Sequence, residues 1–411
     1  MSKKSPQLRF EGFTDDWGER KLGDIVVKAI DNRGKTPPTS ESDKYPLLEV
    51  ASIGGYYPNY SKVTKFVNYN IFNSWFRAHL KKGDILFSTV GNTGLATLMD
   101  DNQDATIAQN IVGFRAKNSN VPEFLLQMFK LPSNLKKAKR IEMGAVQPSI
   151  KVSQLIEVQY LLPKCKHEQE KIGSFFKQLD DTIALHQRKL DLLKEQKKGY
   201  LQKMFPKNGS KIPELRFAGF ADDWELRKLG EVATLSSSKR IHLSDYVTEG
   251  IPFYRGSEIS TGGITGNQEL FISQEKFDEI KEKYGVPSEG DILVTAVGTL
   301  GNLWKVDSRR FYYKDGNLIQ ISKMQVNSDY LLTYFTGGIG KKRLLDSAAG
   351  SNQKALTMVK MREITVDFPS EDEQKKIGAF FKSLDDTIAL HQRKLDLLKE
   401  QKKGYLQKMF V

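Results

Sequence analysis

The sequence predicts an α+β protein in which two pseudo-symmetric globular domains are separated by two long helices that form an antiparallel coiled coil. Two repeated segments predict this fold, together with the difference between the segments that lie between the repeats. Residues 8–23 (LRFEGFTDDWGERKLG) and 215–230 (LRFAGFADDWELRKLG) match at 12 of 16 positions, and residues 179–205 and 384–410 are identical over 27 positions. The segments between these repeats share a pattern of turns and apolar runs but differ in most side chains. We therefore expect two copies of one fold with different surfaces.

The repeats divide the chain into five segments. We expect a first globular domain over residues 1–162, a central helical spacer over 163–205, a polar linker over 206–213, a second globular domain over 214–369 and a C-terminal helical spacer over 370–411. The offset between equivalent residues falls only from 207 at Trp17 and Trp224 to 205 at Leu179 and Leu384. So few insertions or deletions favour one shared fold for both halves.

Each globular domain is expected to be rich in short strands and loops. Residues 83–88 (GDILFS) and 290–295 (GDILVT) are typical of a turn followed by a buried strand, and a bend with two glycines follows each of them. Helical patterns occur around residues 123–129 and 330–335. An apolar strand-like run then closes each domain before Pro163 and Pro369.

After these two prolines the pattern changes to that of a long helix. Apolar residues recur in steps of four and three, which indicates a heptad seam. A run of about 38 residues, at 1.5 Å each, makes a rod of roughly 57 Å. The predicted seam consists of Ile172, Phe176, Leu179, Ile183, Leu190 and Leu193 in the first helix, and of Ile377, Phe381, Leu384, Ile388, Leu395 and Leu398 in the second.

A helix with one apolar seam needs a partner in water. The simplest partner is the other copy in an antiparallel arrangement, because the globular domain between the helices can lie at the far end of the pair. The alternative is an ordinary amphipathic helix that docks on its own domain. Lys197 and Lys402 interrupt the seam, whereas charged residues such as Lys177, Asp180 and Asp181 are expected on exposed outer faces.

Composition limits the partners and the compartment. The net charge of +13 and the isoelectric point near 9.3 favour a polyanionic partner, with nucleic acid as the first candidate. The single cysteine, Cys165, permits no disulfide within the chain and suits a reducing cytoplasm. The first residues do not resemble a signal peptide, and no run of 18 apolar residues occurs. We therefore expect a cytoplasmic protein without a membrane partner.

The sequence carries no recognisable catalytic motif. Residues 33–36 (RGKT) resemble the end of a phosphate-binding loop, but Ala29 stands where the loop needs its first glycine. Pro37 and Pro38 also oppose the helix that should follow. None of the five histidines is paired at metal-ligand spacing. We therefore predict no catalytic residue, no metal site and no cofactor in this chain.

Loops of both domains supply residues suited to reading DNA. Sequence discrimination needs hydrogen-bonding side chains held at a groove, with cations nearby for phosphates. The candidates are Arg33, Lys35, Tyr57, Lys62, Asn92, Gln147, Ser149 and Lys151 in the first domain, and Lys239, Arg240, Arg255, Arg309, Arg310, Asn352, Gln353 and Lys354 in the second. Because the domains differ, we expect them to read two different half-sites, roughly 34–36 Å apart, with the helices as spacer.

Two other classes of function fit the same residues. The chain could be a self-sufficient DNA enzyme with an unfamiliar site, or a coiled-coil scaffold whose basic domains bind proteins or RNA. Methyl transfer by the chain alone would favour the enzyme. Failure to select a two-part DNA motif in the presence of a partner would favour the scaffold.

Two motifs carry a resemblance to a known family. An EQ-x-x-I element at residues 168–172 and 373–377 follows a strand ending in Leu-Pro or Phe-Pro and enters a helix with Leu-Asp-Asp. Together with the LRF-x-GF-x-DDW-x-x-RKLG segment, this element resembles the specificity (S) subunit of type I restriction-modification enzymes. The resemblance covers essentially the whole chain.

The resemblance implies a non-catalytic DNA sequence-recognition subunit. Each target-recognition domain would read one half of an asymmetric bipartite site, and the helices would set the spacing and dock methyltransferase subunits. The implied partners are double-stranded DNA, two methyltransferase (M) subunits that bind S-adenosylmethionine, and two restriction/translocase (R) subunits that use ATP and magnesium. Loops of target-recognition domains vary within such a family, so the resemblance assigns no particular base contact.

Overall fold

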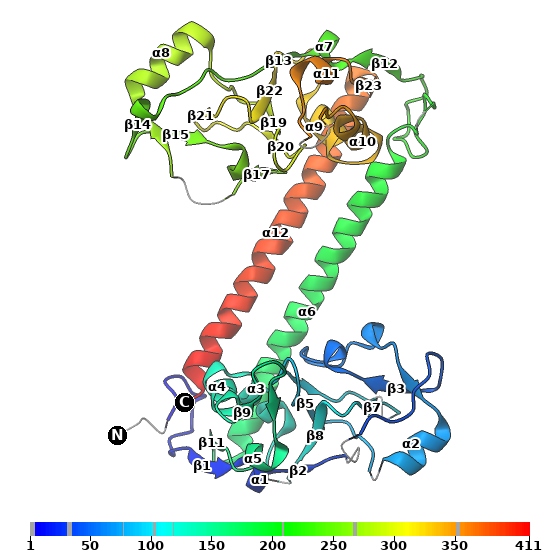
Figure 1. Cartoon of the computed structure of the whole chain (residues 1–411), viewed down its shortest axis with the longest axis vertical. Helices are drawn as coiled ribbons and strands as arrows, with labels where there is room; N and C mark the ends of the chain where they lie inside the picture. Colours follow the sequence, from blue (N-terminus) through cyan, green and yellow to red (C-terminus); the bar gives the residue numbers. More distant parts are fainter. Residues whose placement is uncertain are drawn as a thin grey trace. The chain divides into compact units, whose positions relative to one another are not determined.

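A computed structural model describes residues 5–30, 35–76, 78–101, 104–117, 119–207, 209–265, 269–350 and 354–411. The chain forms two compact units, each of which contains parts of both long helices (Figure 1). Unit 1 comprises Met1–Arg188 and Arg393–Val411, and unit 2 comprises Lys189–Gln392. We call the part of unit 1 before the first long helix body 1, and the part of unit 2 between the two long helices body 2. The five-segment division expected from the sequence stays a prediction.

Body 1 is built around a four-stranded antiparallel sheet with the strand order β2-β8-β5-β6. A second sheet has the order β4-β3-β7, and β1 pairs with β11. In chain order the elements are β1 (Gly18–Lys21), α1 (Leu22–Ile25), β2 (Val26–Lys28), β3 (Tyr45–Leu48), η1 (Val50–Ser52), η2 (Tyr60–Lys62), β4 (Phe66–Val67), α2 (Tyr69–Trp75), β5 (Ile85–Ser88), β6 (Ala96–Leu98), β7 (Thr106–Ile107), β8 (Ile111–Ala116), α3 (Pro122–Lys130), α4 (Pro132–Lys139), β9 (Glu142–Met143), β10 (Ser149–Ile150), α5 (Val152–Leu155) and β11 (Gln159–Leu162).

Body 2 repeats this plan. Its main sheet has the order β13-β22-β19-β20, its second sheet has the order β14-β18-β15-β21, and β12 pairs with β23. The elements are β12 (Glu225–Lys228), α7 (Leu229–Val232), β13 (Thr234–Ser236), η3 (Leu243–Asp245), β14 (Tyr246–Val247), β15 (Ile251–Tyr254), η4 (Gly256–Glu258), β16 (Ile259–Ser260), β17 (Gly263–Ile264), β18 (Phe271–Ile272), α8 (Gln274–Tyr284), β19 (Ile292–Thr295), β20 (Leu303–Lys305), β21 (Tyr312–Tyr313), β22 (Leu318–Ser322), α9 (Ser328–Thr336), α10 (Gly338–Asp346), α11 (Met358–Arg362) and β23 (Thr365–Phe368).

The apolar runs seen in the sequence form the cores. All four residues of β5 and all four of β19 are buried, which explains why neither strand alternates polar and apolar residues. Helix α3 covers the main sheet of body 1: Phe124 and Phe129 are buried in one cluster with Phe87 and Phe114. Each body is therefore an α+β layer structure, in agreement with the predicted fold class.

The long helices are α6 (Lys166–Lys203) and α12 (Glu371–Met409), and they run antiparallel within each unit (Figure 1). In unit 1 the rings of Phe175 and Tyr405 lie 5.1 Å apart at 89°. In unit 2 the equivalent rings of Tyr200 and Phe380 lie 5.1 Å apart at 83°. The same contact therefore occurs twice with the roles of the two helices exchanged.

The two lysines that interrupt the heptad pattern form ion pairs between the helices. Lys402 Nζ lies 2.6 Å from Asp180 in unit 1, and Lys197 Nζ lies 2.5 Å from Asp385 in unit 2. The side chain of Asp180 is only 14% exposed. The expectation that Asp180 lies on an exposed outer face is therefore wrong, because this carboxylate accepts hydrogen bonds from the partner helix and from Gln127 (3.0 Å).

The seam residues fall into two groups. Ile172 and Phe176 are buried in the core of body 1, and Ile377 and Phe381 are buried in the core of body 2. The first turns of each helix thus dock on one body and the middle turns meet the other helix. The last turns enter a core again, since Met409 is buried in the core of body 1, and Leu201 in that of body 2. Further along, Leu190, Leu193 and Leu395 are buried, whereas Leu179, Ile183, Leu384, Ile388 and Leu398 are half-buried.

Candidate nucleic-acid interface

Both bodies are attached to the long helices by the same buried ion pair. The Arg9 guanidinium donates to both carboxylate oxygens of Glu168 at 2.8 Å. Arg216 donates to both oxygens of Glu373 at 2.7 Å. All four side chains are at most 12% exposed. A two-bond pair between an arginine and a carboxylate fixes direction as well as distance, so each repeated N-terminal segment is held to its helix in one orientation.

The glutamine of the EQ-x-x-I element makes a second attachment. Gln169 accepts a bond from the backbone N–H of Val121 at 3.0 Å, just before α3. Gln374 accepts the equivalent bond from the N–H of Asn327 at 3.1 Å, just before α9. Each glutamine thereby satisfies a donor at the start of a helix that has no partner within that helix. The motif therefore positions the bodies on the long helices.

A glycine in each long helix allows a very close approach at the same place. A Cβ atom at Gly173 would lie 2.9 Å from the backbone nitrogen of Phe124, and one at Gly378 would lie 2.9 Å from Asn327 Oδ1. Any other residue would push the start of α3 or α9 away from the long helix. We call these two contacts the glycine notches.

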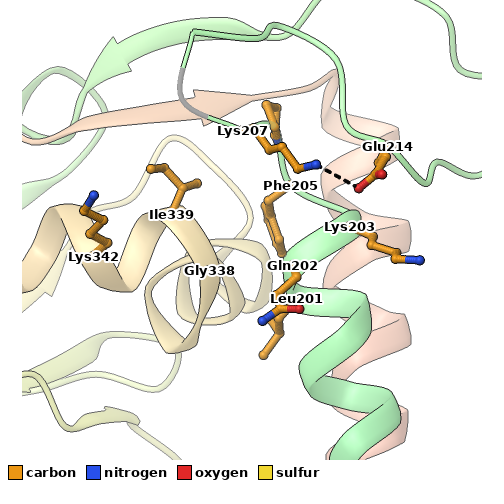
Figure 2. A pocket seen from close by; sticks show the side chains of 10 residues that line it. Leu201, Gln202, Lys203, Phe205, Lys207, Glu214, Gly338, Ile339 and Lys342 are labelled. Carbon is orange, nitrogen blue, oxygen red and sulfur yellow. Dashed lines mark ion pairs between the residues drawn. The ribbon is translucent and has the colours of Figure 1, made fainter.

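Figure 2 shows a pocket of about 430 Å³ where α6 ends against α10 in unit 2. A Cβ atom at Gly338 would lie 2.7 Å from the carbonyl oxygen of Leu201, so only glycine fits there. Lys207 and Glu214, which flank the end of the helix, form an ion pair of 3.4 Å. The pocket is lined by Leu201, Gln202, Lys203, Phe205, Pro206, Lys207, Glu214, Gly338, Ile339 and Lys342. It belongs to the joint between the helix and body 2.

A polar cleft of about 510 Å³ in body 1 brings together two of the predicted DNA-reading residues, Asn92 and Gln147. Backbone bonds between Gly91 and Pro148 (2.9 Å) and a β-bridge between Val90 and Ser149 hold their loops together. The cleft is lined by Thr36, Glu49, Val50, Lys65, Val90, Gly91, Asn92, Ala108, Gln109, Asn110 and Gln147.

The other described candidates of body 1 lie outside the lining of this cleft. Lys35 is exposed next to the lining residue Thr36, and Lys151 is exposed beyond β10. Lys62 is exposed in η2, and the Tyr57 ring packs at 79° against Tyr56. Ser149 is half-buried in β10, and its hydroxyl lies 3.5 Å from the carbonyl oxygen of Met143. Arg33 lies outside the described residues.

In body 2, two candidate arginines lie against aromatic rings, and one of them also forms an ion pair. The Arg309 guanidinium binds Asp307 at 2.5 Å and lies 5.4 Å from the centre of the Trp304 ring. Arg310 lies 5.2 Å from the centre of the Phe277 ring. These contacts limit the movement of both guanidinium groups, which would present them to a ligand in a fixed direction.

Arg255 occupies the position in body 2 that Glu49 occupies in body 1. Both residues follow an inner strand, β3 or β15, and cap the short helix after it. Glu49 binds Lys65 at 2.8 Å, whereas Arg255 binds Glu269 at 2.6 Å. The signs of the two charges are thus reversed on the same backbone turn.

Lys239 belongs to a separate cavity of body 2, with a volume of about 700 Å³. Its ammonium lies 4.9 Å from the centre of the Tyr284 ring, and Ser237 and Ser238 also line this cavity. Arg240 is exposed and lies 3.2 Å from Asp315. Lys354 is exposed, while Asn352 and Gln353 lie outside the described residues. The sixteen DNA-binding candidates of the two bodies stay a prediction.

Several polar lining residues of the body 1 cleft were not selected from the sequence, among them Thr36, Glu49, Gln109 and Asn110. The pair Gln109-Asn110 interrupts an otherwise apolar stretch between β7 and β8. This interruption is a signal that sequence reasoning could have used.

Unit 1 differs from unit 2 at the joint between body and helices. Lys130 donates to the carbonyl oxygen of Gly55 at 2.7 Å, and burial together with the charge of Lys402 lowers the pKa of Lys130 to about 8. Body 2 has Thr336 at the equivalent position of its helix. This half-buried amine is therefore specific to unit 1.

The described residues also bear on other kinds of function. Among them no group of three or more His, Cys, Asp or Glu side chains could hold a metal ion. In that same part of the chain, no helix is long and apolar enough to cross a membrane.

The two bodies are attached to the long helices by the same contacts but differ in their polar surfaces. This arrangement defines a modular recognition protein. The family model of the type I restriction modification DNA specificity domain matches the chain twice, at residues 14–195 and 221–400. The chain therefore belongs to this family. It is a specificity subunit, which recognises DNA sequence and has no catalytic role of its own.

The similarity to relatives extends over nearly the whole length. The type I restriction enzyme MjaVIII specificity subunit of Methanocaldococcus jannaschii is 21% identical over 405 residues, which cover 95% of this chain and 91% of the relative. The putative MjaX specificity subunit of the same organism is 23% identical over 402 residues, again 95% and 91%. A crystal structure of a type I restriction-modification S subunit from M. genitalium has a TM-score of 0.68 at 17% identity, with 99% of each chain covered. These findings confirm the resemblance and the fold class expected from the sequence.

Proposed function

We propose that body 1 and body 2 each read one half of an asymmetric, two-part DNA site. The observation that supports this most strongly is the reversed ion pair, Glu49–Lys65 in body 1 and Arg255–Glu269 in body 2. Opposite charges on the same backbone turn present opposite hydrogen-bonding groups to a base edge, because carboxylates accept and guanidinium groups donate. Two bodies built this way would select different sequences while binding the duplex in the same manner.

We further propose that the two long helices set the gap between the half-sites and dock two methyltransferase subunits. The chain offers the same surface twice, since residues 179–205 and 384–410 are identical. Each copy also leaves leucines exposed on that surface: Leu185 (66%) and Leu192 (52%) on α6, and Leu390 (64%) and Leu397 (59%) on α12. Two equal apolar surfaces on a helix pair support two equal protein partners.

A published structure that is similar to this chain supports partner binding by analogy. It comes from a study of the complex assembly and conformational transition of the type I restriction-modification system, with a TM-score of 0.51. We infer that the full complex of this chain also contains two restriction/translocase subunits. S-adenosylmethionine, ATP and magnesium would then be bound by the partner subunits. Action in the cytoplasm stays a prediction from the sequence.

Exchange of one body tests whether each body reads its own half-site. Residues 24–160 are replaced by the equivalent body of another family member, and the chain is purified with its methyltransferase subunits. Selection of bound duplexes from a random library should return a two-part motif in which one half has changed and the other has not. A change in both halves would contradict separate reading by the two bodies.

The wild-type complex in the same selection tests the proposal as a whole. A motif of two defined parts with a fixed gap is expected. Enrichment of no motif would instead favour a scaffold that binds nucleic acid or protein without sequence preference. Insertion of seven residues, or two turns, into both helices should lengthen the gap and leave both half-site sequences unchanged.

A further inference from the structure

Amide side chains from three separate loops converge in the cleft of body 1. Asn92 follows β5, Gln109 and Asn110 precede β8, and Gln147 lies between β9 and β10. Asn92, Gln109 and Gln147 are exposed, while Asn110 is half-buried. Four of the eleven lining residues of this cleft therefore carry amides.

Backbone hydrogen bonds fix the positions of these loops. The N–H of Thr89 donates to the carbonyl oxygen of Asn110 at 2.8 Å, and the N–H of Ile150 donates to the carbonyl oxygen of Thr89 at 2.7 Å. The buried hydroxyl of Ser88 donates to the carbonyl oxygen of Asn92 at 2.6 Å and accepts from the N–H of Leu95 at 2.8 Å. The loop backbones that carry these amides are therefore fixed before any ligand arrives, which lowers the entropy lost on binding.

One buried polar atom among the described lining residues of the cleft lacks a partner. Within the part of the chain that the structure describes, Asn110 Oδ1 is buried and accepts no hydrogen bond. A buried acceptor without a partner costs roughly 1–3 kcal/mol. A ligand that donates a hydrogen bond to this oxygen would recover that cost.

The charges in the cleft favour a neutral ligand group. Its two charged lining residues among those described, Glu49 and Lys65, neutralise each other at 2.8 Å. A site for a phosphate would present cations without carboxylate partners. The edge of a base fits better, because it is uncharged and carries both donors and acceptors.

We propose that Asn110, together with Asn92 and Gln147, reads an adenine in the half-site bound by body 1. The inference rests on the proposed function. An amide offers one acceptor and one donor side by side, which match the N6 amino group and N7 of adenine in the major groove. Asn110 Oδ1 accepts from N6, and the exposed amides of Asn92 and Gln147 contact the same base pair or its neighbour.

A single near-isosteric change provides the test. Asn110→Asp keeps the shape of the side chain but replaces its donor by an acceptor, so it can no longer bind N7. In the random-duplex selection with the methyltransferase subunits, the preference for adenine at one position should fall by about tenfold or more. Asn92→Ala and Gln147→Ala should lower selection at the same or the adjacent position. The melting temperature of each variant shows whether it is folded.

Two matched controls accompany these variants. Asn73→Ala removes an exposed amide of α2, whose side chain donates to the carbonyl oxygen of Tyr69 at 2.9 Å, and both half-sites should stay unchanged. Asn317→Asp makes the same change in body 2, where the carbonyl oxygen of Asn317 accepts from Ala296 at 2.8 Å, just as Asn110 accepts from Thr89. The half-site of body 1 should not respond to it.

Three results would overturn the inference. The folded variants could leave the body 1 half-site unchanged, could change a position that is not adenine, or could weaken binding equally to all sequences. The last result would mean that the amides contact the DNA backbone. Failure of the proposed function looks different, because the wild-type complex would then select no two-part motif.

Discussion

Body 1 and body 2 have equivalent strands beneath their reading loops, but they fill the space beside their main sheets differently. In body 1, Arg115 extends from β8 and binds Asp84 at 2.7 Å. In body 2 the equivalent carboxylate, Asp291, accepts from Gln320 at 2.7 Å. Body 2 has Ser322 in place of the arginine, and the cavity of about 700 Å³ lies there.

Apart from Lys130 at the joint of unit 1, the differences described here lie away from the long helices. At the helix side, the buried ion pairs, the glutamine contacts and the glycine notches are the same in both bodies. At the far side, residues change size, charge sign and hydrogen-bonding type. The comparison suggests that the attachment of a body and its recognition surface can vary independently of each other.

Substitutions in the helix seam should have the largest effects and should separate the two units. Leu190 lies in unit 2 and Leu395 in unit 1, and each is 1% exposed. Leu190→Asp or Leu395→Asp places an unpaired charge in an apolar seam, so we expect a loss of about 4 kcal/mol or more in the unit that carries it. Hydrogen exchange measured by mass spectrometry can assign the loss to one unit.

Exposed leucines on the same helices serve as controls. Leu192→Asp and Leu397→Asp change positions that are 52% and 59% exposed, so the exchange rates of the chain alone should stay near those of the wild type. Equal destabilisation by the seam and control variants would contradict the assigned seam.

Removal of one partner from a buried ion pair should cost somewhat less. Glu168→Ala and Glu373→Ala each leave an arginine that is at most 12% exposed without its carboxylate, so about 3–5 kcal/mol should be lost in the unit concerned. Glu168 also accepts from Trp17 Nε1 at 3.3 Å, so its loss should be the larger of the two. Urea unfolding monitored by hydrogen exchange in each unit measures both.

The exposed pairs Lys21–Glu157 and Lys228–Glu363 provide the comparison. Both have a distance of 2.7 Å, but all four side chains are at least 50% exposed. Glu157→Ala and Glu363→Ala should therefore change stability far less than Glu168→Ala and Glu373→Ala. A similar loss in the buried and exposed pairs would show that burial does not determine these energies.

The smallest expected effect is a dependence on pH that only unit 1 shows. Below about pH 8, Lys130 is protonated in the folded and in the unfolded chain, and the folded unit bears the cost of its buried charge. Between about pH 8 and 10.5 the folded unit loses the proton while the unfolded chain retains it, so the stability of unit 1 should rise with pH. Lys130→Thr, which copies Thr336 of body 2, should remove this rise.

The measurement compares unfolding free energies of the wild type and the variant at pH 7 and pH 10. Lys139→Thr, at an exposed lysine of α4, is the matched control and should leave the pH dependence unaltered. A rise that survives Lys130→Thr would have to come from another group.

The sequence predicted the fold class well because its strongest signals are periodic or repeated. The heptad pattern indicated both long helices, and the two repeats indicated their pairing. The role of Glu168 was not foreseen, since its partner Arg9 is 159 residues away and only the folded chain brings them together. The position of Asp180 was predicted wrongly, because heptad spacing locates a helix face but does not reveal which cation lies opposite.

The cleft of body 1 was predicted only in part. Asn92 and Gln147 were recognisable as polar residues next to glycine bends. Gln109 and Asn110 interrupt an apolar stretch, but this local signal does not show which other loops lie beside their turn, so they were missed. Their convergence depends on the order of strands in the sheet, which hydrophobic periodicity does not encode.

The glycine notches have a consequence for how such proteins diversify. Each notch accepts only the start of one short helix, so a foreign body needs to match the host chain at that small contact and at one arginine. Evolution could therefore replace an entire body in one genetic exchange without retuning the remainder of the molecule. The fixed geometry of the two glycine notches would thus explain why the sequences of the attached bodies can vary.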